Sequence, residues 1–496
     1  MTNQSNDGLN DQNEATKIRS EKLQKIRQLG IDPWGMRFDN HQKVEKVLTL
    51  PSIPFDDNPT ENVRIAGRIV LRRVMGKVHF LHLWDHTGRI QVMIGQKQIG
   101  ELGWKLAELL DLGDQIGIEG VFGKTKTGEP TVKVLQLTFL GKSLEPHPEK
   151  FHGMSDMEYR LRHRYLDLIY TPETLERSKQ RIVILRTIRE YLEKQDFFEV
   201  ETPIFHAIPG GAAARPFITQ HNALDIQLYL RIALELHLKR LLVGGLERVF
   251  EIGRVFRNEG IDQKHNPEFT MLELYQAYGD YRSMMDLTEG LILSCIDKLG
   301  GGYLRPWGSK QVDFTPPWKR EKYADLFLQY VGVALTDQNA VVQQAQKHHI
   351  PIENKEHDVL VHELFERCVE HHLEGPIFVC DYPAALCPLT KRKWDNPAIA
   401  ERFELYIHGM ELANAYTELN DPDTQAETFR RQLTGLPEEE SMAKMDQEFI
   451  TALRHGMPPA GGLGIGIDRL VMLLTNTQSI RDVILFPLLR PEQNNH

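Results

Sequence analysis

An unusually long polar loop between two strand-like runs constrains this chain more than any other feature. The runs lie within residues 248–281, and the loop covers roughly residues 258–268. A hairpin needs only a few connecting residues, so a charged loop of this length is typical of a binding loop on a rigid base. The polar side chains at its entrance and within it are Arg257, Glu259, Lys264, His265 and Asn266. The sequence therefore predicts a ligand site built on these two strands.

The length of 496 residues is too great for one compact core and predicts two or three domains. The hydrophobic content is ordinary, and no run of about 18 apolar residues could cross a membrane. The polar N-terminus lacks an apolar signal region, which favours a cytoplasmic protein. Neither a disulfide framework nor a structural zinc site is expected, because no CxxC spacing occurs among Cys295, Cys368, Cys380 and Cys387.

The net charge of −10 argues against a protein that binds nucleic acid through nonspecific phosphate attraction alone. The charge is uneven, however, because several lysines and arginines gather within residues 17–27. Such a local basic patch can still guide an RNA onto an acidic protein. On charge alone, an RNA-contacting face and a merely solvated face are equal alternatives.

The chain divides into three predicted segments. Residues 1–14 are polar and without periodicity, which predicts disorder. Residues 15–148 combine an amphipathic helix over 15–29 with a region of short strands. Residues 149–496 form the second predicted domain, and within it residues 282–372 are expected to be a largely helical insertion without recognisable chemistry.

The short strands of residues 62–140 predict a five-stranded OB β-barrel, with an apolar helix over 99–112 between the third and fourth strands. Arg73, Phe80 and Gln91 lie on the first strands, where such a barrel offers stacking and hydrogen-bonding groups to unpaired bases. For Phe80, the alternative of a core position is favoured, because an isolated aromatic residue is more often buried.

A strong helix start opens the body of the second domain, with Thr171 as the N-cap and Pro172 at the first helical position. The helix is expected to reach about Gln195 and to lead into a strand that ends at Pro203. Its predicted buried stripe consists of Leu175, Ile182, Leu185, Ile188 and Leu192.

Glycines crowd a predicted strand in the run GGLGIGIDRLVMLLTN, residues 461–476. Because glycine is unfavourable in strands, this pattern indicates close approach by a ligand or another backbone. Asp468 is expected to cap the following helix, which places Arg469 in the first turn, where the helix dipole disfavours a cation. The pattern suggests that Arg469 binds a ligand, although a glycine-rich bend with an ordinary surface arginine is the alternative.

The run RFELYIHGMELANAYTELND, residues 402–421, contains Glu404 and Glu411 on either side of a probable turn. Paired carboxylates of this kind suit Mg²⁺ that bridges nucleotide phosphates. Further on, Asn414, Tyr416 and Glu418 alternate onto one face. Strict alternation puts Glu411 on the other face, so a shared site requires a bulge or an irregular start.

Together these runs resemble the signature motifs of the class II aminoacyl-tRNA synthetases and, in detail, the bacterial-type lysyl-tRNA synthetases. The resemblance extends from about residue 15 to 491 and includes RRVMGK, IPGGAAARPF, FRNEG…HNPEFTMLELY and GLGIGIDRLVMLLTN. No GxxxxGK[ST] loop, GxGxxG fingerprint or class I signature occurs in the sequence. The fold class expected is therefore α+β and multidomain, with an OB barrel followed by a catalytic antiparallel sheet flanked by helices.

The resemblance implies a homodimeric ligase that joins L-lysine to tRNA(Lys) at the expense of ATP, with up to three Mg²⁺ ions per active site. It assigns catalytic roles to Arg257, Glu259 and Arg469. The expected ATP-binding residues are Arg257, Glu259, His265, Asn266, Phe269, Glu404, Glu411 and Arg469, of which Glu404 and Glu411 would hold the metal. The expected anticodon contacts are Arg73, Phe80 and Gln91.

The same resemblance places the substrate lysine among Gly211, Glu235, Tyr275, Asn414, Tyr416 and Glu418. A buried cationic side chain needs a carboxylate and hydrogen-bond partners, and Glu418 with Tyr275 would supply them. Taken alone, Glu418 would more often be a solvated residue.

Three positions depart from the family pattern: Gln136, Ala385 and Cys387. Gln136 leaves open how one anticodon base is recognised. Ala385 and Cys387 leave open how one wall of the pocket is formed. Two other functions are compatible with the motifs. One is a ligase that attaches lysine to a protein or small molecule, and the other is a non-catalytic RNA-binding protein.

Overall fold

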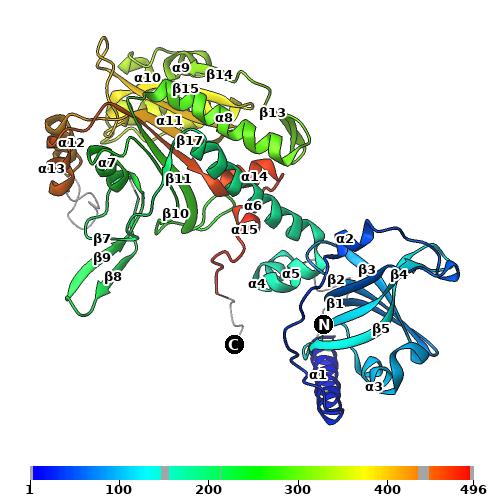
Figure 1. Ribbon diagram of the computed structural model, residues 1–496. Coiled ribbons are helices and arrows are strands. Elements are labelled where there is room, and N and C mark those ends of the chain that lie inside the picture. Colours follow the sequence, from blue (N-terminus) through cyan, green and yellow to red (C-terminus); the bar gives the residue numbers. More distant parts are fainter. Residues whose placement is uncertain (1–3, 147–155, 213, 434–445, 492–496) are drawn as a thin grey trace. The chain divides into compact units, whose positions relative to one another are not determined.

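The computed structural model describes residues 4–146, 156–212, 214–433 and 446–491. The chain forms two compact units, Met1–Ser155 and Asp156–His496 (Figure 1). Their junction lies close to the boundary predicted at residue 148. Each unit has its own apolar core, as expected for a chain of this length.

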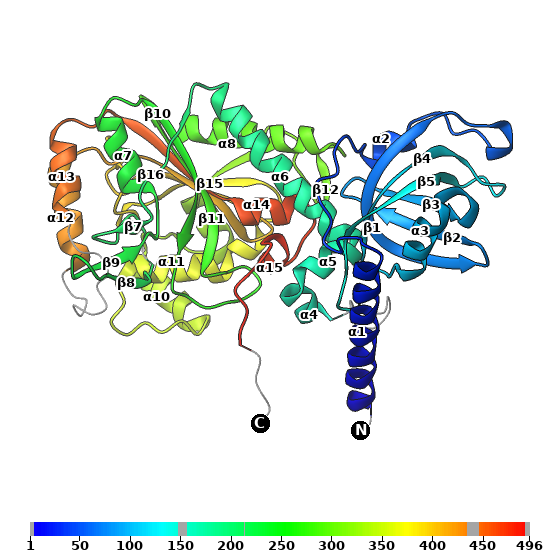
Figure 2. The same ribbon diagram turned by 60° about the horizontal axis from the view of Figure 1, so that its bottom comes forward.

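The first unit contains a closed barrel with the strand order β1-β2-β3-β5-β4, which confirms the predicted OB fold (Figure 2). Helix α3 (Gln96–Leu109) connects β3 to β4, where the apolar helix was predicted. The strands are β1 (Asn62–Met75), β2 (Val78–Trp84), β3 (Arg89–Gly95), β4 (Gln115–Lys124) and β5 (Pro130–Gly141). Alternating apolar residues fill the barrel: Ile65, Leu81, Leu83, Val92, Ile94, Ile116 and Val132 are each fully buried.

Helix α1 (Gln4–Gln28) begins well before the predicted start at residue 15. The expected disorder of residues 1–14 is therefore wrong from Gln4 onward, while residues 1–3 lie outside the described part of the chain. The polar stretch contains no proline, and extending an existing helix is far less costly than nucleating one. Two short elements complete this unit: α2 (Val44–Leu48) and η1 (Phe55–Asp57).

The second unit is built on an eight-stranded sheet with the order β14-β15-β16-β17-β18-β11-β10-β6. Neighbouring strands are antiparallel except for the pairs β14–β15 and β10–β6 at its edges, and this confirms the predicted fold class. In spatial order the strands are β14 (Lys319–Lys322), β15 (Ile377–Pro383), β16 (Ile399–Ile407), β17 (Met410–Thr417), β18 (Ala460–Gly466), β11 (Glu268–Ala277), β10 (Arg248–Phe256) and β6 (Phe198–Glu199).

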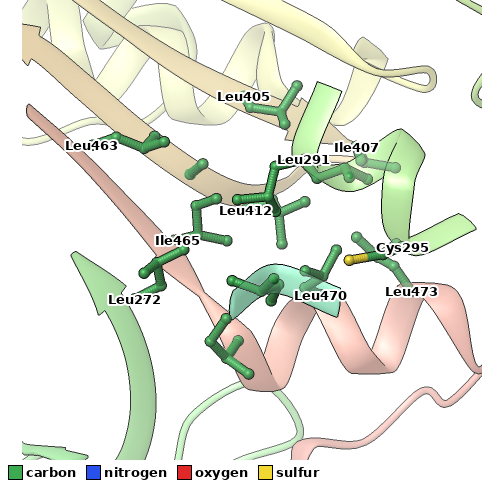
Figure 3. Packing of buried hydrophobic residues seen from close by; sticks show 14 of the residues in the cluster. Leu272, Leu291, Cys295, Leu405, Ile407, Leu412, Leu463, Ile465, Leu470 and Leu473 are labelled. Carbon is green, nitrogen blue, oxygen red and sulfur yellow. The ribbon is translucent and has the colours of Figure 1, made fainter. Parts of the chain in front are cut away.

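One face of this sheet packs against α6 (Pro172–Glu193), α8 (Tyr281–Leu299) and α14 (Ile467–Leu474). Leu272, Leu405, Leu412 and Ile465 of the sheet lie against Leu291, Leu470 and Leu473 of the helices (Figure 3). The opposite face of the sheet does not pack against these three helices. There α7 (Glu235–Val243) packs over β10 and β11 through Leu238, Leu242, Val249 and Tyr275.

The buried side of α6 differs from the predicted stripe. Ile188 and Leu192 are buried as expected, but Ile182 is 57% exposed and its neighbour Ile184 is fully buried instead. Spacings of three and four residues allow two stripes in this sequence, and the packing partners in α8 select between them.

Residues 282–372 are not simply a helical insertion. They include α9 (Tyr323–Val331), α10 (Gln338–Lys347) and α11 (His357–Cys368), but α8 fills the main core and β14 extends the main sheet. The remaining elements of the described chain are α4 (Met157–Arg162), α5 (Arg164–Tyr170), β7 (Phe205–His206), β8 (Ile218–His221), β9 (Ile226–Leu230), β12 (Leu304–Trp307), β13 (Lys310–Asp313), η2 (Glu370–His372), η3 (Ala384–Leu386), α12 (Pro422–Leu433), α13 (Gln447–Arg454) and α15 (Ile480–Val483).

Candidate active site

The glycine-rich strand β18 forms the floor of a site on the sheet face opposite the main core. It lies between β11 and β17, so that Gly464 pairs with Glu273 and Asn414, and Gly462 pairs with Tyr275 and Tyr416. A Cβ atom at Gly462 would lie only 1.8 Å from Glu418 Oε1. Gly462 therefore allows close approach by the Glu418 and Tyr275 side chains, whereas the prediction was close approach by a ligand or another backbone.

A cavity of about 260 Å³ lies above one end of this floor. It is lined by predicted ATP-binding residues from the long loop, β11, β17 and α14: Arg257, Glu259, His265, Asn266, Phe269, Glu411 and Arg469. The structure thus brings together residues that are more than two hundred positions apart in the sequence. Glu404 instead lines an adjoining cavity of about 430 Å³ that shares Lys264, His265, Glu411 and Arg469 with the first.

Two arginines face the first cavity. The Arg257 guanidinium lies 5.2 Å from the centre of the Phe269 ring, and its Nε donates to the backbone oxygen of Ile232 at 3.4 Å. Arg469 donates to the backbone oxygen of Glu411 at 2.7 Å and contacts His265 Nε2 at 3.3 Å. A backbone oxygen orients each of these side chains, and Arg469 also lies 3.9 Å from Glu411 Oε2. Both guanidinium groups line the cavity and can contact an anionic ligand there.

The predicted N-cap role of Asp468 is wrong, because Gly466 caps α14. The Asp468 carboxylate instead accepts hydrogen bonds from the backbone nitrogen of Thr270 at 2.7 Å and from Arg181 at 2.6 Å. It joins α14 to β11 and α6, and this fixes Arg469 in the first helical turn.

A bulge in β17 resolves the facing of Glu411. Leu405 pairs with Ala413 and Tyr406 pairs with Glu411, so Leu412 has no partner and points into the core with Ala413. Glu411 consequently lies on the site face, where it accepts a hydrogen bond from Asn414 at 3.1 Å. Asn414 therefore borders the nucleotide-sized cavity, at the edge of the pocket predicted for lysine.

The second cavity holds a densely bonded carboxylate. Glu404 accepts hydrogen bonds from Arg402 and from the hydroxyls of Tyr382 at 2.7 Å and Tyr406 at 2.5 Å. Burial favours the neutral acid, but the Arg402 charge and the two hydroxyls outweigh it and lower the pKa of Glu404. Burial and the nearby Glu404 charge raise the pKa of Glu411.

Glu370 also lines this cavity and comes from the segment expected to carry no chemistry. Burial raises its pKa to about 7, and it accepts a hydrogen bond from Tyr406 at 3.0 Å. Within the described residues, no three His, Cys, Asp or Glu side chains are arranged to hold a metal ion. The two hard carboxylates Glu404 and Glu411 nevertheless suit Mg²⁺, which commonly takes one or two carboxylates together with substrate phosphates.

A separate cluster of buried acidic side chains, Glu235, Glu273 and Glu418, lies at the other end of the floor and is called the acidic pocket below. Glu418 is fully buried, and its backbone nitrogen donates to Ala460 at 2.8 Å, which fixes it beside β18. Glu273, also buried, accepts hydrogen bonds from the backbone nitrogen of Leu234 at 3.0 Å and from the Tyr275 hydroxyl at 3.2 Å. Gly211 adjoins Glu235, because a Cβ atom on it would lie 3.3 Å from the Glu235 Cβ.

Burial dominates the electrostatics of this pocket. It raises the pKa of Glu418 to about 8 and that of Glu273 to about 7. It also raises the pKa of Tyr275 and of Tyr416 well above the usual value, so both hydroxyls stay neutral. Burial therefore disfavours the ionised acids, and an ammonium group that contacts them stabilises their charged form.

Sequence reasoning missed Lys239. It placed Glu273 on the ligand-facing side of its strand, together with Phe269, Met271 and Tyr275, but gave it no role of its own. Lys239 Nζ is fully buried, lies 2.5 Å from Glu235 Oε1 and also contacts Glu418. The available signal was the four-residue spacing of Glu235 and Lys239 on one helix, which usually marks a surface ion pair. For Glu273 the signal was a polar residue on an otherwise apolar strand face.

Of the predicted base-contacting residues, Gln91 is buried, whereas Arg73 and Phe80 are not. Arg73 is exposed and pairs with the half-buried Phe80, so the core alternative for Phe80 is not what the structure shows. Gln91 donates to Thr131 Oγ1 at 2.8 Å. Of the departures from the family pattern, Gln136 and Ala385 are exposed. Cys387 is buried and its sulfur accepts a hydrogen bond from Arg402, the residue that also holds Glu404.

Comparison with known proteins identifies both units. Residues 156–490 match the tRNA synthetases class II (D, K and N), and residues 63–140 match the OB-fold nucleic acid binding domain. The chain belongs to the class II tRNA synthetases. Within this family it is 48% identical over 489 residues to a lysine–tRNA ligase of Thermoanaerobacter sp., with 97% of each chain covered.

Other similar class II enzymes carry the same description. A lysine–tRNA ligase of Carboxydothermus hydrogenoformans is 50% identical over 97% of this chain and 98% of its own. One of Listeria monocytogenes is 47% identical over 99% of both chains. The chain is accordingly a ligase of the lysine–tRNA ligase group that forms an aminoacyl-tRNA. Among its described helices, none has the length and apolar content needed to cross a membrane.

Proposed function

We propose that the acidic pocket binds L-lysine and that the adjoining cation-lined cavity binds ATP, so that the two substrates meet over the glycine floor. The single observation that carries this assignment is the fully buried Glu418 beside Glu273, Glu235 and Tyr275. A pocket with three buried carboxylates suits a substrate with two ammonium groups. Glu418 and Tyr275 would contact the far ammonium, and Glu235 with Gly211 would contact the end that reacts.

In the first step, an oxygen of the lysine carboxylate forms a bond to the α-phosphorus of ATP, and the bond from that phosphorus to pyrophosphate breaks. The products are lysyl-adenylate and pyrophosphate. Negative charge gathers on the α-phosphate in the transition state, where Arg257 would stabilise it with paired donors. Orientation by Glu259, Asn266 and Phe269 would supply much of the remaining rate, so no side-chain nucleophile is required.

Glu404 and Glu411 would hold Mg²⁺, which supplies charge neutralisation for the β- and γ-phosphates when bound. Arg469 and His265 lie between the two cavities and would contact the same phosphates. The hydrogen bonds from Tyr382 and Tyr406 fix the Glu404 carboxylate before any ligand arrives. This preorganisation limits the entropy lost on binding.

In the second step, a hydroxyl of the terminal adenosine of tRNA(Lys) attacks the lysyl carbonyl carbon, and AMP leaves with the bonding electron pair. The outer face of the barrel would bind anticodon bases through Arg73, Phe80 and Gln91. Arg73 and Phe80 are cross-strand neighbours, which places a cation beside an aromatic surface. The bases could stack on this surface while the cation contacts the backbone.

We also propose a cytoplasmic homodimer. Ile182 of α6 is 57% exposed and Phe198 of β6 is 62% exposed, and the family resemblance implies a homodimer. Covering these side chains with a second copy would remove apolar surface from water. Light scattering after size-exclusion chromatography tests this point, and a monomer at micromolar concentration would contradict it.

The decisive test is amino-acid-dependent ATP–pyrophosphate exchange with each of the twenty amino acids, followed by charging of purified tRNA(Lys). A response to lysine alone, with subsequent tRNA charging, is expected. Exchange without charging would indicate a ligase for another acceptor. RNA binding without exchange would indicate a non-catalytic RNA-binding protein.

A further inference from the structure

A protein lysine already occupies one end of the acidic pocket. Lys239 stands one helical turn after Glu235 on α7, and its Nζ is fully buried between Glu235 and Glu418. The hydrogen bond to Glu235 Oε1 measures 2.5 Å. A buried ammonium group so close to the proposed substrate position contributes directly to the charge that the substrate meets.

The acidic pocket contains three carboxylates and two tyrosine hydroxyls in addition to the Lys239 ammonium group. Glu235 comes from its own helix, Glu273 from β11, and Glu418 follows β17. Tyr275 and Tyr416 face the same space as neutral hydroxyls. Arg257 also acts on Glu273 from the adjoining cavity. With Arg257 left aside for the substrate carboxylate, three ionised carboxylates and the Lys239 ammonium group leave two negative charges.

We propose that Lys239 is a positioning residue that sets this charge, so that the pocket matches a substrate with two ammonium groups and rejects a neutral side chain of equal length. The inference rests on the proposed function and deepens it. L-lysine brings an α- and an ε-ammonium group, and its carboxylate would be met by Arg257. A neutral analogue would leave one buried carboxylate without a counter-charge, which is costly.

The contacts of Lys239 favour a counter-ion that stays in place when the substrate binds over a side chain that the substrate must displace. Lys239 is held on a helix whose neighbours Leu238 and Leu242 are buried, and its hydrogen bond is made to Glu235. Glu418 forms an ion pair with the same ammonium group, and a carboxylate offers about four lone-pair sites in all. Glu418 therefore keeps its acceptor capacity for a second ammonium group, while Lys239 stays in place.

The test uses the full-length enzyme with three variants. Lys239→Gln keeps a hydrogen-bond donor for Glu235 without the charge, Lys239→Met removes both, and Lys239→Arg keeps the charge. The matched control is Lys142→Met, because Lys142 Nζ is equally buried and is also paired with two carboxylates, Asp111 and Asp114, in the barrel unit. Steady-state pyrophosphate exchange gives the KM and kcat for lysine and the discrimination against L-norleucine.

Removing one partner of a buried charge pair is commonly costly, so the lysine KM is expected to rise about thirtyfold or more in Lys239→Gln and Lys239→Met. The kcat and the KM for ATP should change by less than about threefold. The KM for lysine should recover at higher pH, where the crowded carboxylates ionise, and discrimination against norleucine should fall. Lys239→Arg should retain most of the discrimination, and Lys142→Met should leave the lysine KM unchanged.

A folded Lys239→Gln enzyme with an unaltered lysine KM and pH profile would overturn the inference, because Lys239 would then only fill space. A lowered lysine KM would also overturn it, since the side chain would be a displaceable plug. If Lys239→Met does not fold, the contrast between the Gln and Arg variants decides. Absence of lysine-dependent exchange in the unaltered enzyme would instead refute the proposed function itself.

Discussion

Each unit of the molecule buries a lysine between two carboxylates, but the two clusters are completed differently. In the barrel unit, Asp114 accepts hydrogen bonds from Lys142 and Ser143 at 2.8 Å and from the Asp111 backbone at 2.7 Å. In the catalytic unit, Glu418 forms an ion pair with Lys239, but its carboxylate accepts no backbone hydrogen bond from the described residues. The first cluster satisfies itself and stabilises a fold, whereas the second leaves acceptor capacity for a ligand.

This comparison yields a general expectation. Removing a member of the satisfied cluster should lower stability and leave activity unchanged, because its hydrogen bonds are all internal. In the catalytic unit, removing a group that can still bind a ligand should lower activity and change the free energy of unfolding little. The following variants test this contrast, from the largest expected effect to the smallest.

Arg257→Ala should have the largest effect. Among the described residues, its guanidinium makes one long hydrogen bond, at 3.4 Å, a ring contact with Phe269 and an electrostatic interaction with Glu273, so the Tm should shift by less than about 3 °C. Loss of a cation at the transition state should reduce kcat/KM for pyrophosphate exchange by about a thousandfold or more. Near-normal exchange in this variant would remove Arg257 from its assigned role.

Glu418→Gln should raise the KM for lysine about a hundredfold, because the neutral amide cannot offset a buried ammonium group. The KM for ATP should change little. Asp114→Asn is the counterpart in the barrel, and it should lower the Tm by several degrees while the lysine KM stays constant. If Asp114→Asn altered lysine use as strongly as Glu418→Gln, the contrast between the clusters would fail.

Gly462→Ala should raise the KM for lysine about tenfold, because the added Cβ would lie 1.8 Å from Glu418 Oε1 and 2.6 Å from Tyr275 Cε1. Both side chains would have to move away from their positions over the floor. Gly375→Ala is the control, since nothing lies within 4 Å of its added Cβ. Equal kinetics in the two variants would show that the floor tolerates a methyl group.

The smallest expected effect is a few-fold fall in the lysine KM as pH rises through about 8. The pKa of Glu418 is raised to about 8, so the empty pocket holds a proton at neutral pH. The substrate ammonium binds the ionised carboxylate, so binding releases a proton and strengthens as pH rises. Calorimetry at pH 7 in two buffers of different ionisation enthalpy measures this release, and Glu418→Gln should abolish its Glu418 component.

The sequence predicted the frame of the site well because its signals are local. The glycines of residues 461–466 mark a strand that is closely approached by its surroundings, and a sequence expresses such a pattern directly. The OB barrel was predicted for the same reason. The facing of Asn414, Tyr416 and Glu418 also follows from a two-residue period.

Other features were not predictable because they depend on partners distant in the chain. Ile182 and Ile184 are equivalent in an isolated helix, and only packing against α8 buries the latter. Asp468 matches the pattern of a helix cap, but Thr270 and Arg181 bind its carboxylate. The role of Lys239 depends on Glu418, which is remote in sequence, so the spacing on α7 alone could not show it.

The bulge at Leu412 imposes a constraint on length as well as on residue type. Another apolar residue could replace Leu412, whose side chain belongs to the main core. Deleting Leu412 would reverse the facing of the side chains on one side of the deletion, because a shift of one position moves each side chain to the opposite face of the sheet. Either Glu411 or the Asn414-to-Glu418 series would then point away from its ligand, with every one of these residues still present. A substitution scan would therefore class Leu412 as tolerant. Only a deletion scan would show that this unpaired residue keeps the nucleotide-facing Glu411 and the lysine-facing residues on the same side of the sheet.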